Sequence, residues 1–144
     1  MRYYLDTNVF LYANTRKSKF YKSCRFVLEQ VALGKISAQT SVETVQEIIF
    51  VASRQKQVGV GVRIAKEAWA ILGSLCALTE EITNEFLKLA AKYPKTESRD
   101  LVHVATCKVL GIDKIFSVDK HFDKISEVKR IDPCEFEKEH APKV

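Results

Sequence analysis

Short apolar runs of strand length alternate with longer amphipathic segments along almost the whole chain. The runs occupy residues 3–5, 36–38, 76–78, 114–118 and 128–131. None of them is joined to the next by a turn sequence typical of a hairpin. Strands separated by helices in this way predict βαβ units, and therefore a parallel sheet within an α/β fold.

The segments between the runs repeat their apolar residues every three or four positions, which predicts helices. The predicted helices cover residues 19–33, 41–55, 63–74, 82–93 and 99–110. Ser41 and Thr79 precede two of them, where a side-chain oxygen can cap the helix. Gly34 and Gly111 follow two others, where glycine commonly ends a helix.

Three segments are predicted to lack regular structure. Gly59 and Gly61 favour a break over residues 57–62, and Pro94 favours an exposed loop over residues 94–98. Residues from about 134 to 144 are charged and are expected to fray as a tail. The whole chain, residues 1–144, is expected to form a single domain that includes this tail.

The composition fits one globular domain of 144 residues, of which 47% are hydrophobic. The first twenty residues carry charges and no unbroken apolar core, and no later segment is long enough to span a membrane. We therefore expect a cytoplasmic protein that does not associate with a membrane. The formal net charge of +5 favours a polyanionic partner such as nucleic acid, although many basic proteins bind none.

The four cysteines give no sign of a zinc or redox site. They stand at positions 24, 76, 107 and 134, without a CxxC pair. Structural zinc sites and redox motifs need tight local spacing. Free cysteines that pack as small apolar residues are the simpler interpretation.

Two of the apolar runs lead directly into an aspartate, in LDTN at Asp6 and in SVDKHF at Asp119. The C-terminal ends of parallel strands lie at one edge of a sheet, and ligands bind in the crevice there. An aspartate in either place can instead begin a turn or cap a helix. The same pattern at both ends of the chain favours a shared site with two carboxylates.

A third carboxylate, Asp100, lies in the first turn of the predicted helix 99–110. This helix is apolar on nearly all sides, so we expect it to be buried. A buried carboxylate without a partner is costly, and the helix N-terminus offsets only part of that cost. A nearby cation would offset the rest. His103 shares this face and is expected to be a packed, hydrogen-bonded residue rather than a ligand.

The fourth acidic position is open between Glu43 and Glu47, which project from the same side of the predicted helix 41–55. Glu43 lies in the first turn, where the helix dipole alone explains an acidic residue. Glu47 lies deeper in the helix, and the apolar residues Phe50 and Val51 flank its side of the helix. We favour Glu47 for this reason and keep Glu43 as the alternative.

Convergence of these carboxylates would require protonation or a bound cation. Two unit charges about 4 Å apart repel by about 4 kcal/mol at an effective dielectric constant of about 20. Oxygen ligands without cysteine or clustered histidine select Mg²⁺ or Mn²⁺ over zinc. Such an ion can activate water and neutralise a phosphate, so an acidic metal site in a basic protein fits phosphodiester hydrolysis.

Three stretches of the chain resemble the PIN-domain family, in particular the toxin ribonucleases of VapBC toxin–antitoxin pairs. They are LDTNVFLYA, TSVETVQEII and SRDLVHVATCKVLGIDKIFSVDKHFDKI. The most specific feature is an Asp-x-x-His-x-Ala segment, followed by a glycine and by a strand that ends in Asp. Residues 56–95 contribute least to the resemblance.

The resemblance implies a three-layer α/β/α sandwich with a central parallel sheet of about five strands. It also implies a Mg²⁺- or Mn²⁺-dependent endoribonuclease whose catalytic and metal-binding acids are Asp6, Glu47, Asp100 and Asp119. The residues that would support these acids without binding the metal are Thr7, Asn8 and Ser117. Ser117 stands where the family more often has threonine. The family further implies an RNA substrate, a homodimer, and an antitoxin whose C-terminal segment lies in the active-site groove.

Two other functions are compatible with parts of this pattern. One is a catalytically weak or inactive PIN-like module that binds RNA or a protein partner, although the presence of all four acids counts against it. The other is a phosphatase with an acidic site, but that class wants a DxD motif after its first strand, and Asn8 replaces the second aspartate. The sequence leaves open which RNA is cut, whether an antitoxin exists and how many ions bind.

Overall fold

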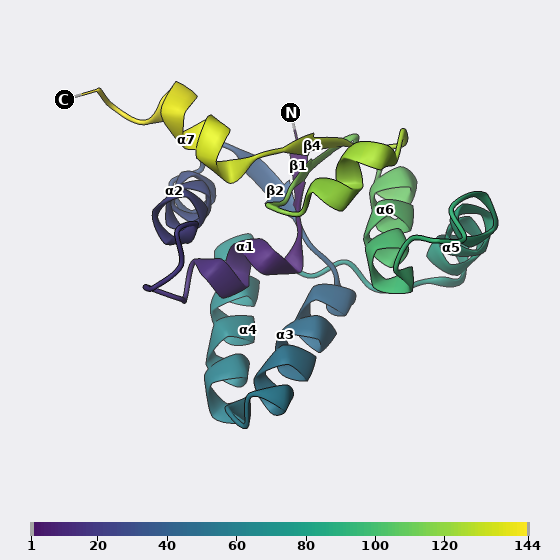
Figure 1. Cartoon of the computed structure of the whole chain (residues 1–144), viewed down its shortest axis with the longest axis horizontal. Helices are drawn as coiled ribbons and strands as arrows, with labels where there is room; N and C mark the ends of the chain where they lie inside the picture. The colour runs from purple at the N-terminus through teal and green to yellow at the C-terminus, as the bar shows by residue number, and fades with distance from the viewer. Residues whose placement is uncertain (1, 144) are drawn as a thin grey trace.

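A parallel four-stranded sheet forms the centre of the computed structural model, which describes residues 2–143 (Figure 1). Its strands run in the order β2 (Ser37–Gln39), β1 (Arg2–Leu5), β3 (Lys114–Phe116) and β4 (Lys129–Ile131). In the register, Tyr4 pairs with both Gln39 and Ile115, and Phe116 pairs with Ile131. The α/β fold with a parallel sheet is confirmed.

The fifth expected strand, over residues 76–78, does not form within the described part of the chain. Cys76 makes a single parallel bridge to Ser41. Its N–H donates to the Thr40 carbonyl at 2.9 Å, and its carbonyl accepts from the Val42 N–H at 3.0 Å. Leu78 is already 43% exposed, so the chain reaches the surface within two residues of this bridge.

Helices cover both faces of the sheet. They are α1 (Thr7–Tyr12), α2 (Tyr21–Ala32), α3 (Val42–Arg54), α4 (Val58–Leu72), α5 (Glu80–Lys92), α6 (Ser98–Leu110) and α7 (Pro133–His140), with a 3₁₀ turn, η1 (Lys120–Lys124). Neighbouring strand residues enter opposite cores: Leu5 and Phe116 face α1, α2, α4 and α7, whereas Tyr4 and Ile115 face α5 and α6. This alternation, required by the pleat of a strand, produces three layers (Figure 1).

The predicted break over residues 57–62 is wrong, because α4 begins at Val58 and includes both glycines. The chain turns only at residues 55–57, where Lys56 has a φ of 56°. Gly61 lies inside the helix because α3 packs closely against it. A Cβ atom at Gly61 would meet the Cβ of Ala52 at 2.5 Å, so the glycine permits contact between the helices rather than a loop.

The expected frayed tail is also wrong for most of its length. Residues 133–140 form α7, which is capped by Asp132 and carries Pro133 in its first turn. Phe136 is 6% exposed and packs edge-on against Phe116, with ring centroids 5.0 Å apart. The apolar contact of one aromatic residue with the sheet therefore orders a segment whose composition is mostly charged.

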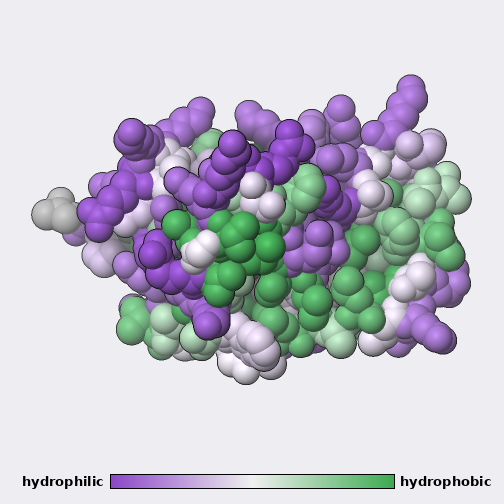
Figure 2. All heavy atoms as spheres, turned by 90° about the horizontal axis from the view of Figure 1, so that it is seen from below, coloured by the Kyte–Doolittle hydropathy of each residue, from purple (hydrophilic) through white to green (hydrophobic). Residues whose placement is uncertain are grey.

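The helices α3 and α4 project from the sheet as a pair, at the bottom of Figure 1. Figure 2 shows the molecule from this side, where hydrophobic side chains form an open surface patch. Helix α4 supplies several exposed large apolar residues: Val58, Val60, Val62 and Trp69. Large exposed apolar patches on a protein surface commonly mark contacts with another chain.

Candidate metal centre

Asp6 lies where β1 ends and α1 begins, and it is only 5% exposed to solvent. Its N–H donates to the Phe116 carbonyl at 3.0 Å, which continues the pairing of β1 with β3 by one residue. Its Oδ1 caps α1 by accepting from the Thr7 N–H at 2.8 Å. Its Oδ2 accepts from Asn8 Nδ2 at 2.9 Å and from Ser117 Oγ at 2.7 Å.

Ser117 connects Asp6 to Asp119. The Ser117 hydroxyl donates to Asp6 and accepts from the Asp119 N–H at 3.0 Å and from Asn8 Nδ2 at 3.0 Å. Asn8 Oδ1 also accepts from the Val118 N–H at 3.4 Å. The strand-end aspartates of β1 and β3 therefore lie at one edge of the sheet, held together by two short polar side chains.

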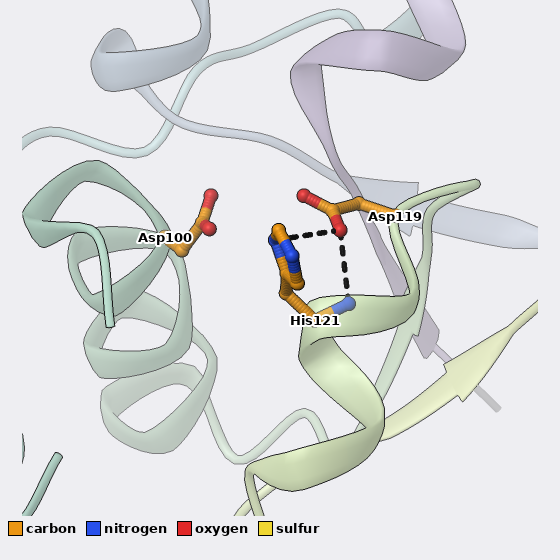
Figure 3. A group of neighbouring side chains, drawn as sticks. All are labelled: Asp100, Asp119 and His121. Carbon is orange, nitrogen blue, oxygen red and sulfur yellow. Dashed lines mark hydrogen bonds and ion pairs between the residues drawn. The ribbon is translucent and has the colours of Figure 1, made fainter. Parts of the chain in front are cut away.

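Asp100 faces Asp119 and His121 from the first turn of α6 (Figure 3). One ligand atom from each of the three residues lies within 4.8 Å of the other two. Asp119 Oδ1 accepts from the His121 N–H at 2.9 Å, and His121 Nδ1 lies 3.1 Å from the same oxygen. The group offers two carboxylates and one imidazole to a single point.

The electrostatics of this cluster disfavour a second ionised carboxylate. Burial, followed by the charges of Asp6 and Asp119, raises the pKa of Asp100 to about 7. Burial also raises the pKa of Asp6, although His103 and the Ser117 hydroxyl oppose that rise. A cation among these oxygens would favour the ionised forms, so the donor set fits a divalent ion.

Glu47 enters the same region from α3. Its Oε1 accepts from Thr7 Oγ1 at 3.1 Å and forms a hydrogen bond with His103 Nε2. Glu43 is half-buried one turn earlier, and burial together with the charge of Glu47 raises its pKa. The structure thus connects Glu47, the favoured residue of the two, to the neighbours of Asp6.

His103 is fully buried at the centre of this network. Its Nδ1 lies 2.6 Å from the Tyr4 hydroxyl, which in turn lies 2.8 Å from Ser41 Oγ. Its Nε2 lies 3.7 Å from Asp6 Oδ1 in addition to its bond with Glu47. Burial lowers the pKa of His103, but its bond to Glu47 and the nearby carboxylates outweigh burial and raise it overall. His103 is therefore the packed, hydrogen-bonded residue that the sequence predicts.

Two members of this site, His121 and Tyr4, were not predicted from the sequence. His121 follows Asp119 by two positions, and only the tight turn of η1 brings its ring back to the carboxylate. Tyr4 looks like a core strand residue, and it is indeed fully buried, but its hydroxyl anchors His103. The two-residue spacing of Asp119 and His121 was the available signal for the first, whereas Tyr4 gave none.

The chain is similar to known proteins over most of its length. The PIN-domain family model matches residues 3–128. Ribonuclease VapC7 of Mycobacterium tuberculosis (strain ATCC 25618 / H37Rv) is 25% identical over 130 residues, which cover 90% of each protein.

Two solved structures share the fold at low identity. VapBC2 from Rickettsia felis, bound to a DNA fragment from its promoter, superposes with a TM-score of 0.73 at 16% identity, covering 91% of this chain and 98% of that one. FitAcB from Neisseria gonorrhoeae gives 0.67 at 16% identity, covering 92% and 98%. At such identities the likeness establishes the fold.

Proposed function

The chain belongs to the PIN-domain family, and we propose that it is a divalent-metal-dependent endoribonuclease that serves as the toxin of a toxin–antitoxin pair. The observation that carries this proposal is that Asp100 and Asp119 face each other at the edge of a parallel sheet where Asp6, joined to Asp119 through Ser117, also lies. The similarity to a protein named ribonuclease VapC7 supports the same activity.

The proposed ligands are Asp6, Glu47, Asp100 and Asp119, with Glu43 as the alternative to Glu47. Their carboxylate oxygens suit Mg²⁺ or Mn²⁺. His121 adds an imidazole nitrogen beside Asp119, a ligand type that transition metals accept more readily than Mg²⁺ does. The raised pKa of Asp100 supports this assignment. It follows first from burial and then from the charges of Asp6 and Asp119, and a bound cation would favour the ionised carboxylate.

A divalent ion held there would activate water for attack on phosphorus and offset the charge that develops on the phosphate. Hydrogen bonds from neighbouring side chains and backbone groups hold these carboxylates in position before RNA binds. Ser117 and Asn8 orient one oxygen of Asp6, and the Thr7 N–H fixes the other. Thr7 and His103 orient Glu47. One of the carboxylates would also accept a proton from the attacking water.

Two kinds of observation suggest partners for this protein: the names of structures with a similar fold, and the exposed apolar residues on its surface. We propose an antitoxin protein because similar folds occur in solved VapBC and FitAB-type structures, whose names describe toxin–antitoxin or DNA-bound assemblies. The exposed apolar residues of α4 support a homodimer.

No helix within residues 2–143 is long and apolar enough to cross a membrane. We propose that the protein cuts RNA in the cytoplasm.

The direct test is cleavage of RNA by the purified protein with Mg²⁺ or Mn²⁺ and with EDTA. We expect cleavage only with metal, and its loss in Asp119→Asn. Asp113→Asn, which changes an aspartate just before β3, is the matched control. RNA that stays intact with both ions would contradict the activity and favour a PIN-like binding module. Cleavage at the wild-type rate by Asp119→Asn would contradict the assigned site.

A further inference from the structure

A pocket of about 410 Å³ opens directly beside the candidate metal centre. Asp100 and His121 form part of its wall, so it shares two residues with the cluster that faces Asp119 (Figure 3). The rest of the wall comes from the segment between α5 and α6 and from η1. These further lining residues are Lys95, Thr96, Glu97 and Lys124.

An ion pair and hydrogen bonds join the two walls of the pocket to each other. At the end of α5, Lys92 Nζ lies 2.8 Å from Glu127 Oε2. The neighbouring Tyr93 hydroxyl donates to Glu127 Oε1 at 2.7 Å and accepts from the Ser126 N–H at 3.2 Å. These contacts join the segment that carries Lys95 to the chain just beyond η1, which carries Lys124, so the pocket exists before any ligand binds.

The lysines of this region fall into two kinds. Lys92 is paired with a carboxylate, whereas within residues 2–143 neither Lys95 nor Lys124 forms an ion pair with a carboxylate. Both are exposed and line the pocket. The carboxylates in the wall are Asp100, which faces the metal site, and Glu97, the N-cap residue of α6. A bound cation would neutralise the first and leave the two ammonium groups free for an anion.

We propose that this pocket binds the RNA nucleotide next to the phosphate that is cut, with Lys95 and Lys124 on its phosphate oxygens. This inference rests on the proposed ribonuclease function and deepens it by naming where the substrate backbone lies. Lysine contacts with phosphate supply affinity through charge and through release of counterions, without reading the base. The pocket therefore positions the strand at the metal centre and does not select its sequence.

The test is the affinity of a fluorescently labelled single-stranded RNA, measured by anisotropy with Ca²⁺ in place of Mg²⁺ and with the RNA checked for integrity. The double variant Lys95→Ala/Lys124→Ala is compared with Lys88→Ala/Lys138→Ala, which removes the same charge from exposed positions outside the pocket. We expect the pocket variant to bind about tenfold more weakly than the control, and the slope of log K against log salt to fall by about 1.4 for two lost contacts.

Cleavage kinetics separate this inference from the function on which it rests. The pocket variant should raise KM for RNA and leave kcat and the binding of Mn²⁺ near wild type. Equal affinity and equal salt slopes in the two double variants would overturn the pocket assignment, even if wild type cuts RNA. Lysine-dependent binding of RNA that wild type never cuts would refute the ribonuclease and support the pocket.

Discussion

Glu47 and His103 are hydrogen-bonded to each other although 56 positions separate them in the sequence. Glu47 approaches from α3 and His103 from α6, and both side chains are largely withdrawn from solvent. The other ring nitrogen of the histidine bonds to Tyr4 on the central strand. The carboxylate is thus positioned by a chain of contacts that reaches into the middle of the sheet.

Replacement of His103 by Gln should destabilise the protein. The change shortens the link between Tyr4 and Glu47 and removes the positive charge available to the buried carboxylates, and an unsatisfied buried polar group costs about 1–3 kcal/mol. Urea unfolding in EDTA measures the loss. His140→Gln, on α7, is the control and should cost much less. Equal free energies of unfolding in the two variants would show that the network adds nothing.

Glu47→Gln and Glu43→Gln should differ in their binding of Mn²⁺. Glu47 is hydrogen-bonded to Thr7 and His103, which both lie beside Asp6, whereas Glu43 lies one turn earlier, in the first turn of α3. Calorimetric titration of Mn²⁺ should show a clear loss of affinity for Glu47→Gln and a smaller one for Glu43→Gln. The opposite order would assign the fourth acidic position to Glu43.

The metal-free protein should lose stability as the pH rises from about 5 to about 8, in part through Asp100. The pKa of this carboxyl is about 7 in the folded state against 3.8 for the free group. Between these values the folded state holds a proton that the unfolded state has released, so stability falls with rising pH. Asp100→Asn should therefore be more stable than wild type at pH 8 in EDTA, with a smaller difference at pH 5.

Thermal unfolding at several pH values, with and without Mn²⁺, measures this effect. Mn²⁺ should restore the stability of wild type at pH 8 and should help Asp100→Asn less, because the variant lacks one of the proposed ligands. A difference between the two proteins that stays constant from pH 5 to pH 8 would contradict the shifted pKa.

Two glycines of α4 should respond oppositely to alanine. Gly61→Ala places a Cβ atom 2.5 Å from the Cβ of Ala52 and must push α3 and α4 apart. Such overpacking typically costs about 1–3 kcal/mol. Gly59→Ala meets no atom within 4 Å and should stabilise the helix by about 0.4–1 kcal/mol. Chemical denaturation measures both, and a loss of equal size at Gly59 would refute the packing argument.

Local sequence patterns determined much of the fold and the outline of the site. The alternation of short apolar runs with amphipathic helices predicted a parallel sheet, and parallel strands necessarily bring Asp6 and Asp119 to the same edge. The apolar surroundings of Asp100 predicted a position close to the core, and the residue is half-buried. Thr79 caps α5, as its position before that helix predicted. These inferences succeed because each depends on residues within one element or on a general property of parallel sheets.

Tertiary packing decided the remainder, because it depends on which elements touch. The packing of α3 against α1 and α6 places Glu47 beside Thr7 and His103. Helical periodicity alone leaves open which of two glutamates four positions apart lies there. The close approach of α3 and α4 turns Gly61 from an expected break into a helix contact, and the sheet orders α7 through Phe136. The sequence by itself determined the elements and the acids at their ends, whereas contacts between distant residues determined how those acids are held.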